Sequence, residues 1–149
     1  MYAKINNNTV VEYPVNIYEA HPNVSFPVEW TGGTVEGSTY VLVKRTNFPD
    51  APHTKTVTES TPVLSNSEWV QVWTLVDASA EVVAQRVEDK WRAVREQRNA
   101  LLFSCDWTQL SDSPLTSEKK TEWQTYRQSL RDITLQPNPF SIVWQTPPV

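Results

Sequence analysis

Apolar and polar residues alternate in the first half of the chain and recur at helical spacing in the second. The clearest strand is predicted at 68–76, where alternate positions hold Val, Val, Thr and Val on one face and Trp, Gln, Trp and Leu on the other. Since both faces carry apolar side chains, we expect a central strand or one covered on two sides. Shorter β-branched runs predict strands at 40–45 and 54–58. Segments 2–5 and 9–13 predict a hairpin around three asparagines, because Asn tolerates the left-handed geometry of a tight turn.

The pattern changes to helical spacing after residue 78. Ser79 is the predicted N-cap of a first helix, whose apolar positions recur at steps of three, four or seven as far as Cys105. Thr116 is the predicted N-cap of a second helix, whose apolar stripe runs from Trp123 to Ile133. Two prolines follow soon after and are expected to end this helix, because proline lacks the backbone donor that a helix needs.

These elements predict an α+β chain. We expect a small antiparallel β-rich domain at 1–77, in which prolines and glycines keep regular structure short between 14 and 39. We expect residues 78–149 to form an antiparallel helical hairpin with an extended, Pro-bracketed tail, since about ten residues suffice to turn one helix back on another. The apolar stripes of such a hairpin need cover. The β part, the tail, a second copy of the chain or a foreign protein could supply it.

Charge excludes some partners. The chain of 149 residues has 13 Lys and Arg against 17 Asp and Glu. Residues 1–78 hold 4 basic and 8 acidic side chains, and the rest hold 9 of each, so neither part has the basic excess that nucleic acid requires. Along the first helix acidic and basic residues interleave, with Glu88 and Arg92 at the favourable spacing of four, which favours a solvated, salt-bridged face over an RNA or membrane surface.

The expected location is the cytoplasm of the cell in which the chain is made. No apolar run has the length of a signal peptide core or of a membrane span. Cys105 is the only cysteine, so no disulfide can form within the chain, and a reducing compartment is the simpler expectation.

Residues that carry chemistry are few. A metal site needs several converging ligands, and the chain has two histidines and one cysteine. His21 and His53 each lie beside a proline, and we expect exposed or capping roles for them; Cys105, on an apolar stripe, is expected to be a small buried hydrophobe. No glycine-rich phosphate loop is present. A carboxylate pair for glycoside cleavage needs only to meet in space, so that alternative stays open. The sequence otherwise predicts no enzyme, no cofactor, no metal and no small-molecule substrate.

The seven tryptophans point instead to binding. An indole ring supplies a large contact area with few rotatable bonds, so Trp is enriched at interaction surfaces. Six apolar residues of the interhelical linker and the tail are the predicted partner-binding set: Trp107, Leu110, Leu115, Phe140, Ile142 and Trp144. The alternative is that these residues close the core of the hairpin itself, because apolar residues in short linkers usually pack locally.

Several motifs of the second half occur together in one order. They are an Arg-rich run ending in two leucines, Asp-Trp-Thr-Gln-Leu, a Pro-Leu-Thr segment, a Trp-x-x-Tyr-Arg-x-x-Leu-Arg-Asp segment and a terminal Trp motif, at 92–102, 106–110, 112–116, 122–133 and 143–147. In these motifs the chain resembles the phage tail assembly chaperone family, also described as tail-fibre assembly proteins. The resemblance covers roughly 79–148. Gln145 departs from it, because proline often follows that Trp in the family.

The resemblance implies a non-catalytic role in building the tail fibre of a phage. A chaperone or accessory protein would bind a tail-fibre or tail protein in the host cytoplasm during assembly. The alternative is a structural subunit, a tail or fibre adaptor, that stays in the virion tail. A homo-oligomer is compatible with either.

Overall fold

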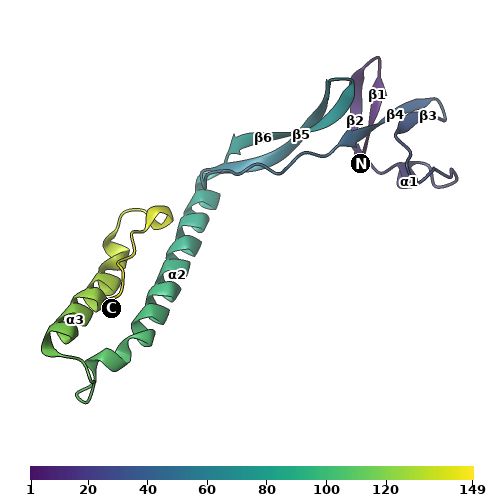
Figure 1. The fold of residues 1–149 in the computed structure, drawn as a ribbon. Helices are drawn as coiled ribbons and strands as arrows, with labels where there is room; N and C mark the ends of the chain where they lie inside the picture. The colour runs from purple at the N-terminus through teal and green to yellow at the C-terminus, as the bar shows by residue number, and fades with distance from the viewer. The chain divides into compact units, whose positions relative to one another are not determined.

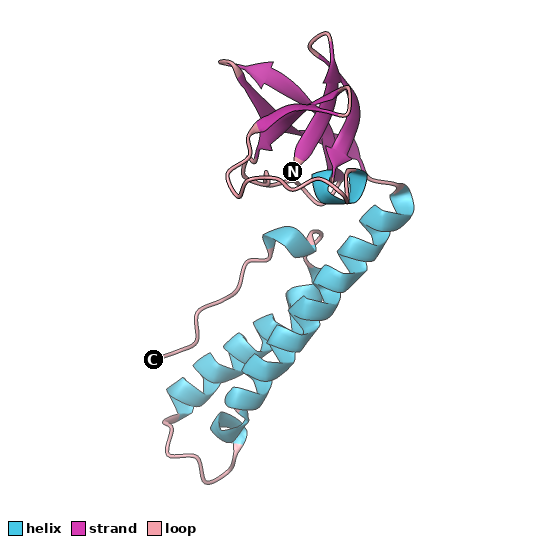
Figure 2. Cartoon of the chain, turned by 90° about the vertical axis from the view of Figure 1, so that its right-hand side faces the viewer, coloured by secondary structure: helices cyan, strands magenta, loops and turns pink.

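The computed structural model describes residues 1–149 and divides them into two compact units, Met1–Ala78 and Ser79–Val149. The strands lie in the first unit and nearly all helical residues in the second, as Figure 2 shows. The predicted α+β class is therefore confirmed. Each unit is described by itself.

The first unit is built on one six-stranded sheet. Its strands are β1 (Tyr2–Asn6), β2 (Thr9–Val15), β3 (Gly32–Val35), β4 (Ser38–Lys44), β5 (Lys55–Ser65) and β6 (Glu68–Asp77). The strand order is β2-β1-β4-β6-β5, and β3 also pairs with β4. All paired strands are antiparallel except β4 and β6. Figure 1 shows the long β5–β6 ribbon and the labelled strands beside it.

The strand predictions are confirmed, with one change of length. The β1–β2 hairpin turns at Asn7 and Asn8, whose φ values of 48° and 58° are left-handed, as the three asparagines predicted. The strand predicted at 54–58 continues to Ser65, because β5 follows β6 past a register shift next to the buried Pro62. Within 14–39 the chain forms a single short helix, α1 (Ile17–Ala20), in addition to β3.

Buried and half-buried side chains from several strands and loops form the core of the first unit. The fully buried members are Val15, Ile17 and Tyr40, with Tyr2, Phe26, Trp30 and Val35 packed against them. Gly32 in β3 has a φ of 125°, and a Cβ added there would collide with the carbonyl oxygen of Tyr40. This position therefore requires glycine for both its backbone angle and its close approach to β4.

His21 differs in part from its prediction. It occupies the C-cap of α1, as a capping role requires, but its side chain is buried, with 8% exposed. Nδ1 lies 2.8 Å from Oε2 of Glu36, and Nε2 lies 2.9 Å from the hydroxyl of Tyr40. Two polar partners make the burial of an imidazole tolerable, since a buried polar group without partners is costly. The expectation of an exposed His21 was wrong.

A polar network joins β2, β5 and β6. The Tyr13 hydroxyl donates to Oε1 of Glu59, and Nε2 of Gln71 donates to the same oxygen over 2.6 Å. Oε1 of the same Gln71 side chain accepts a hydrogen bond from the backbone N–H of Thr46. Burial and the hydrogen bond to Glu59 raise the pKa of Tyr13. The hydrogen bonds from Tyr13 and Gln71 in turn lower the pKa of Glu59, so the network favours the ionised carboxylate.

The second unit contains two α-helices and three short 3₁₀ turns. They are α2 (Ala80–Ser104), η1 (Asp106–Gln109), α3 (Ser117–Arg131), η2 (Asp132–Leu135) and η3 (Pro139–Ser141). Both predicted N-caps are confirmed: Oγ of Ser79 accepts from the Val82 N–H, and Oγ1 of Thr116 accepts from the Lys119 N–H, each over 3.3 Å. Figures 1 and 2 show α3 beside α2 and running in the opposite direction, and the two helices are in contact.

Side chains from both helices and the tail form the core of the second unit. Cys105, Tyr126 and Leu130 are its buried centre, with Leu101, Leu102, Trp123 and Trp144 packed around them. The prediction of a buried Cys105 is confirmed, and this residue is the C-cap of α2.

The exposed face of α2 carries salt bridges, as predicted, but Glu88 and Arg92 each pair with another residue rather than with each other. Arg95 contacts Glu88 at 2.6 Å, and Arg92 contacts Asp89 at 3.1 Å.

Candidate partner-binding surface

The linker after α2 presents two apolar side chains to solvent. Trp107, in η1, is 46% exposed, and Leu110, just after η1, is 56% exposed. The inner part of the Trp107 ring packs against the ring of Trp123 on α3, with ring centroids 6.2 Å apart. Trp123 in turn meets Tyr126 edge to face at 5.6 Å. One side of Trp107 is thus held by α3 while the rest of the ring stays accessible.

A buried polar cluster lies beside these residues. Nη1 of Arg127 donates to the carbonyl oxygen of Leu102 over 2.8 Å and to Sγ of Cys105 over 3.1 Å, and Nη2 donates to Oδ1 of Asp106 over 2.7 Å. Only 9% of Arg127 is exposed. Burial by itself would lower the pKa of this guanidinium, but the hydrogen bonds to Asp106 and Cys105 raise it above its ordinary value. Arg127 is therefore a permanently charged link between α3 and the end of α2.

Thr108 completes the cluster from within η1. It is fully buried, and its hydroxyl donates to the carbonyl oxygen of Cys105 over 2.7 Å. The same hydroxyl accepts a hydrogen bond from Nε2 of Gln109 over 2.8 Å. The segment that carries Trp107 is consequently fixed at both of its neighbours, Asp106 and Thr108.

The other four predicted residues lie in different surroundings. Leu115 is half-buried at the entrance to α3, and Ile142 is half-buried in the tail. Phe140, the middle residue of η3, is exposed, whereas Trp144 is partly buried against the core of the second unit. The amide of Gln136 bonds both backbone groups of Val143, at 2.9 Å and 3.1 Å, so the tail is tied back to the end of η2. The six residues are thus divided between an exposed group and a packed group.

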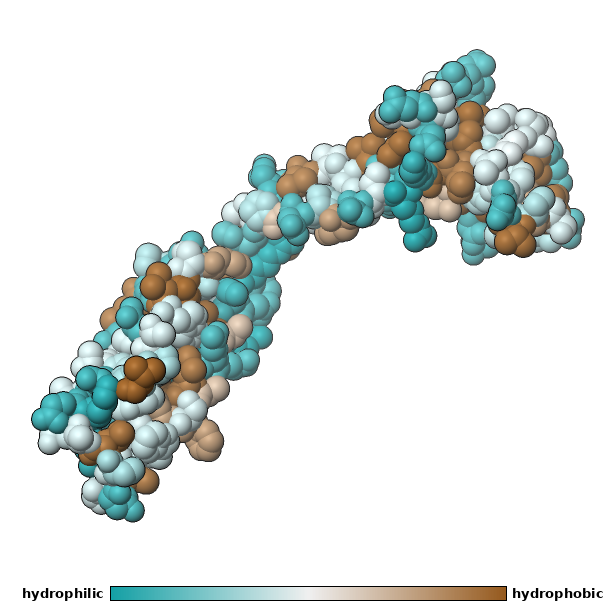
Figure 3. Space-filling model, viewed as in Figure 1, coloured by the Kyte–Doolittle hydropathy of each residue, from teal (hydrophilic) through white to brown (hydrophobic).

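Five further large apolar residues of the second unit are exposed, Val82 and Val149 among them. Phe103, Leu135 and Val143 are all largely accessible. Figure 3 shows brown apolar residues separated by teal and white polar ones on the visible face of this unit. Phe103 could have been found from the sequence, because it lies off the apolar stripe that ends at Cys105. Leu135 and Val143 lie in irregular segments and give no periodic signal.

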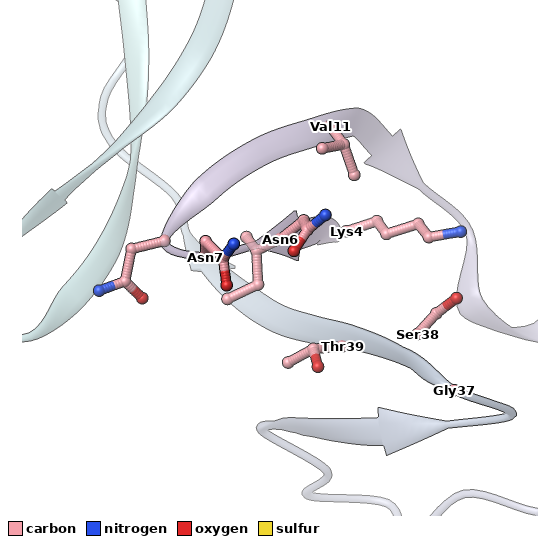
Figure 4. A pocket seen from close by; sticks show the side chains of 9 residues that line it. Lys4, Asn6, Asn7, Val11, Gly37, Ser38 and Thr39 are labelled. Carbon is pink, nitrogen blue, oxygen red and sulfur yellow. The ribbon is translucent and has the colours of Figure 1, made fainter.

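The chain has shallow hollows in both units. In the first, a hollow of about 480 Å³ lies between the β1–β2 turn and the start of β4, and Lys4 is the only charged residue that lines it. Figure 4 shows Lys4 and Ser38 extending to the same side of this hollow. In the second, a hollow of about 390 Å³ lies between α3 and the end of the tail.

No group of three His, Cys, Asp or Glu side chains is placed to hold a metal ion. None of the helices has the length and apolar character of a membrane span.

The comparison with known families concerns the second unit. Residues 91–149 match the family described as "Phage tail assembly chaperone protein". This range begins within α2 and includes all six predicted partner-binding residues, so the resemblance seen in the motifs is confirmed over these residues. The match supports a role in phage tail assembly, which implies binding to phage tail proteins and action inside the host cell during assembly. No curated protein and no solved structure matches the chain.

Proposed function

We propose that the chain is a non-catalytic tail-fibre assembly chaperone or accessory protein that binds a fibre or tail protein through apolar residues of its helical unit. One observation carries the proposal: the range that matches the tail assembly chaperone family is also the range that exposes Trp107 and Leu110. The predicted partner-binding set of Trp107, Leu110, Leu115, Phe140, Ile142 and Trp144 is retained as a proposal. Residues 1–77 and 78–149 are proposed to act as separate domains, in the host cytoplasm.

The physical argument is that a chain of an oligomeric fibre exposes apolar surface until its sister chains associate. A partner that covers this surface reversibly needs a few large apolar anchors within a polar surround. Trp107 fits this description, since the residue is 46% exposed while its ring also contacts that of Trp123. Leu110, three positions later, extends the same exposed segment.

Co-expression with a tail-fibre protein from the same genome tests the proposal. We expect soluble, assembled fibre with the wild-type chain and a reduced yield with the double variant Trp107→Ala and Leu110→Ala. Val28→Ala is the matched control, because Val28 is a fully exposed apolar residue of the other unit. An equal yield of assembled fibre without the chain would remove the proposed chaperone role.

A second candidate is a structural subunit retained in the virion tail. The observation that favours it is the β-rich unit, which has its own core and lies entirely outside the matched range, so it could hold a second virion component. Mass spectrometry of purified particles separates the two candidates. Stoichiometric presence of the chain supports the retained subunit, and its absence supports the transient chaperone.

A further inference from the structure

We infer that Asp106 and Arg127 are positioning residues that hold Trp107 and Leu110 in the orientation that binds the fibre or tail protein. The inference rests on the proposed function. It assigns the roles of presenting and contacting the partner to different residues. Trp107 and Leu110 would touch the partner, whereas Asp106 and Arg127 would act through them.

The geometry shows how one guanidinium could fix the segment. Arg127 projects from α3, and its two terminal nitrogens bond the last turn of α2 and the first residue of η1. These contacts span 25 residues of sequence to Leu102 and 21 to Asp106, so they join the two helices at the point where the chain leaves α2. The planar fork of arginine suits this double contact, because its donors point in fixed directions.

The Asp106 bond is the contact that acts on the exposed segment alone. Nη1 still bonds the Leu102 carbonyl if Asp106 is changed, so the end of α2 keeps its partner. Nη2 has Asp106 as its hydrogen-bond partner, and Trp107 is the next residue in the chain. Loss of this bond would leave η1 with its local backbone hydrogen bonds, the Thr108 side-chain contacts and the Trp107–Trp123 packing.

The expected effect follows from preorganisation. A side chain that is already held in its bound orientation loses less conformational freedom on binding than a mobile one. Trp107 and Leu110 would both have to be ordered at binding if η1 were loosened. We therefore expect affinity for the partner to fall about tenfold without the Asp106 contact.

Asp106→Ala is the test, because alanine has no oxygen to accept the bond from Arg127, and Asp112→Ala is its control. Both aspartates lie in the same linker, both are exposed, and both substitutions remove one negative charge. Asp112 forms no hydrogen bond or ion pair, whereas Asp106 bonds Arg127. The Asp106 side chain is 58% exposed but that of Arg127 is only 10% exposed, so loss of the pair should lower stability, and circular dichroism must show that both variants stay folded under the conditions of the binding assay.

Two measurements decide the outcome. The first is the affinity of each variant for the tail-fibre protein used in the co-expression test. The second needs no partner: NMR hydrogen exchange of the backbone amides of residues 106–110, together with the indole resonance of Trp107 assigned with Trp107→Phe. We expect Asp106→Ala to weaken binding about tenfold and to speed exchange in η1, with Asp112→Ala unchanged in both.

The remaining outcomes contradict the inference in distinguishable ways. If Trp107→Ala with Leu110→Ala weakens binding but Asp106→Ala binds like Asp112→Ala, the positioning role is wrong and the proposed surface stands. Unchanged exchange in Asp106→Ala also overturns the positioning role. If the double variant binds the fibre protein as the wild type does, the proposed surface fails, and the inference fails with it.

Discussion

Replacing Trp144 with alanine tests whether the tail of the chain belongs to the fold or to the interface. Trp144 is one of the six predicted partner-binding residues, yet its ring packs against the buried centre formed by Cys105, Tyr126 and Leu130. Trp107 offers a natural comparison, because it is the same residue type in the same unit but 46% exposed. We expect Trp144→Ala to destabilise the helical unit and Trp107→Ala to change it little.

The magnitude follows from burial. Truncating a fully buried Trp costs about 3–5 kcal/mol, and a partly buried ring such as that of Trp144 should cost about 2–3 kcal/mol. In a unit the size of Ser79–Val149, about 4–8 °C of Tm is lost per kcal/mol, so a fall of roughly 10–20 °C is expected. Trp107→Ala removes mainly one aromatic contact, with Trp123, and should cost about 1 kcal/mol.

Thermal unfolding followed by far-ultraviolet circular dichroism measures both effects, since most helical residues lie in this unit. Trp144→Phe is the control, because it keeps an aromatic ring against the core and should recover most of the lost stability. If Trp144→Ala melts within about 3 °C of the wild type, the ring contributes nothing to the core. Trp144 would then be available to a partner, and our reasoning from its packing would be refuted.

Three other predictions concern the cap, the polar network and a glycine. Thr116→Ala removes the N-cap of α3 and should cost about 1 kcal/mol in thermal unfolding, whereas Thr121→Ala, in mid-helix, should cost nothing or stabilise. The pKa of Glu59 is lowered in the folded state. Its contribution to the free energy of unfolding is therefore fully present above the ordinary pKa of glutamate, about 4.3, and is lost as pH falls through the lower pKa of the folded state. Acid unfolding followed by Trp fluorescence should therefore show a weaker pH dependence in Glu59→Gln, and identical curves would contradict this. Gly32→Ala should destabilise the β-rich unit more than Gly37→Ala, because only the former adds a clash with the paired strand; equal melting temperatures would contradict it.

Local features could be predicted from short stretches of sequence. The Asn7–Asn8 turn and the caps at Ser79 and Thr116 each depend on one side chain and its immediate neighbours in the chain. The chemistry of these residues is the same in any fold, because Asn tolerates left-handed backbone and Ser and Thr hydroxyls bond free helix N–H groups. The order of the elements therefore followed from pattern alone.

Features that depend on distant residues could not be predicted. His21 is buried because Glu36 and Tyr40, 15 and 19 positions away, supply polar partners. The Arg127 contacts reach across 21 and 25 positions, and nothing in the local sequence indicates which carbonyl or carboxylate a mid-helix arginine will meet.

The predicted partner-binding set could not be divided into exposed and packed residues from the sequence either. Its members share an apolar character, but only the tertiary packing distinguishes an exposed Trp107 from a Trp144 set against the core. Their role in binding stays a prediction.

Because Cys105 is buried, the reactivity of its thiol is a natural probe of how often the helical unit opens. It is the only thiol in the chain, it is 2% exposed, and it belongs to the buried cluster with Tyr126 and Leu130. A disulfide reagent such as Ellman's can reach it only when that unit opens, so its rate of modification reports the opening of residues around α2 and α3 without any signal from the sheet. Engineered cysteines elsewhere on the surface would react at once in the native protein, which allows site-selective labelling without removing the natural thiol.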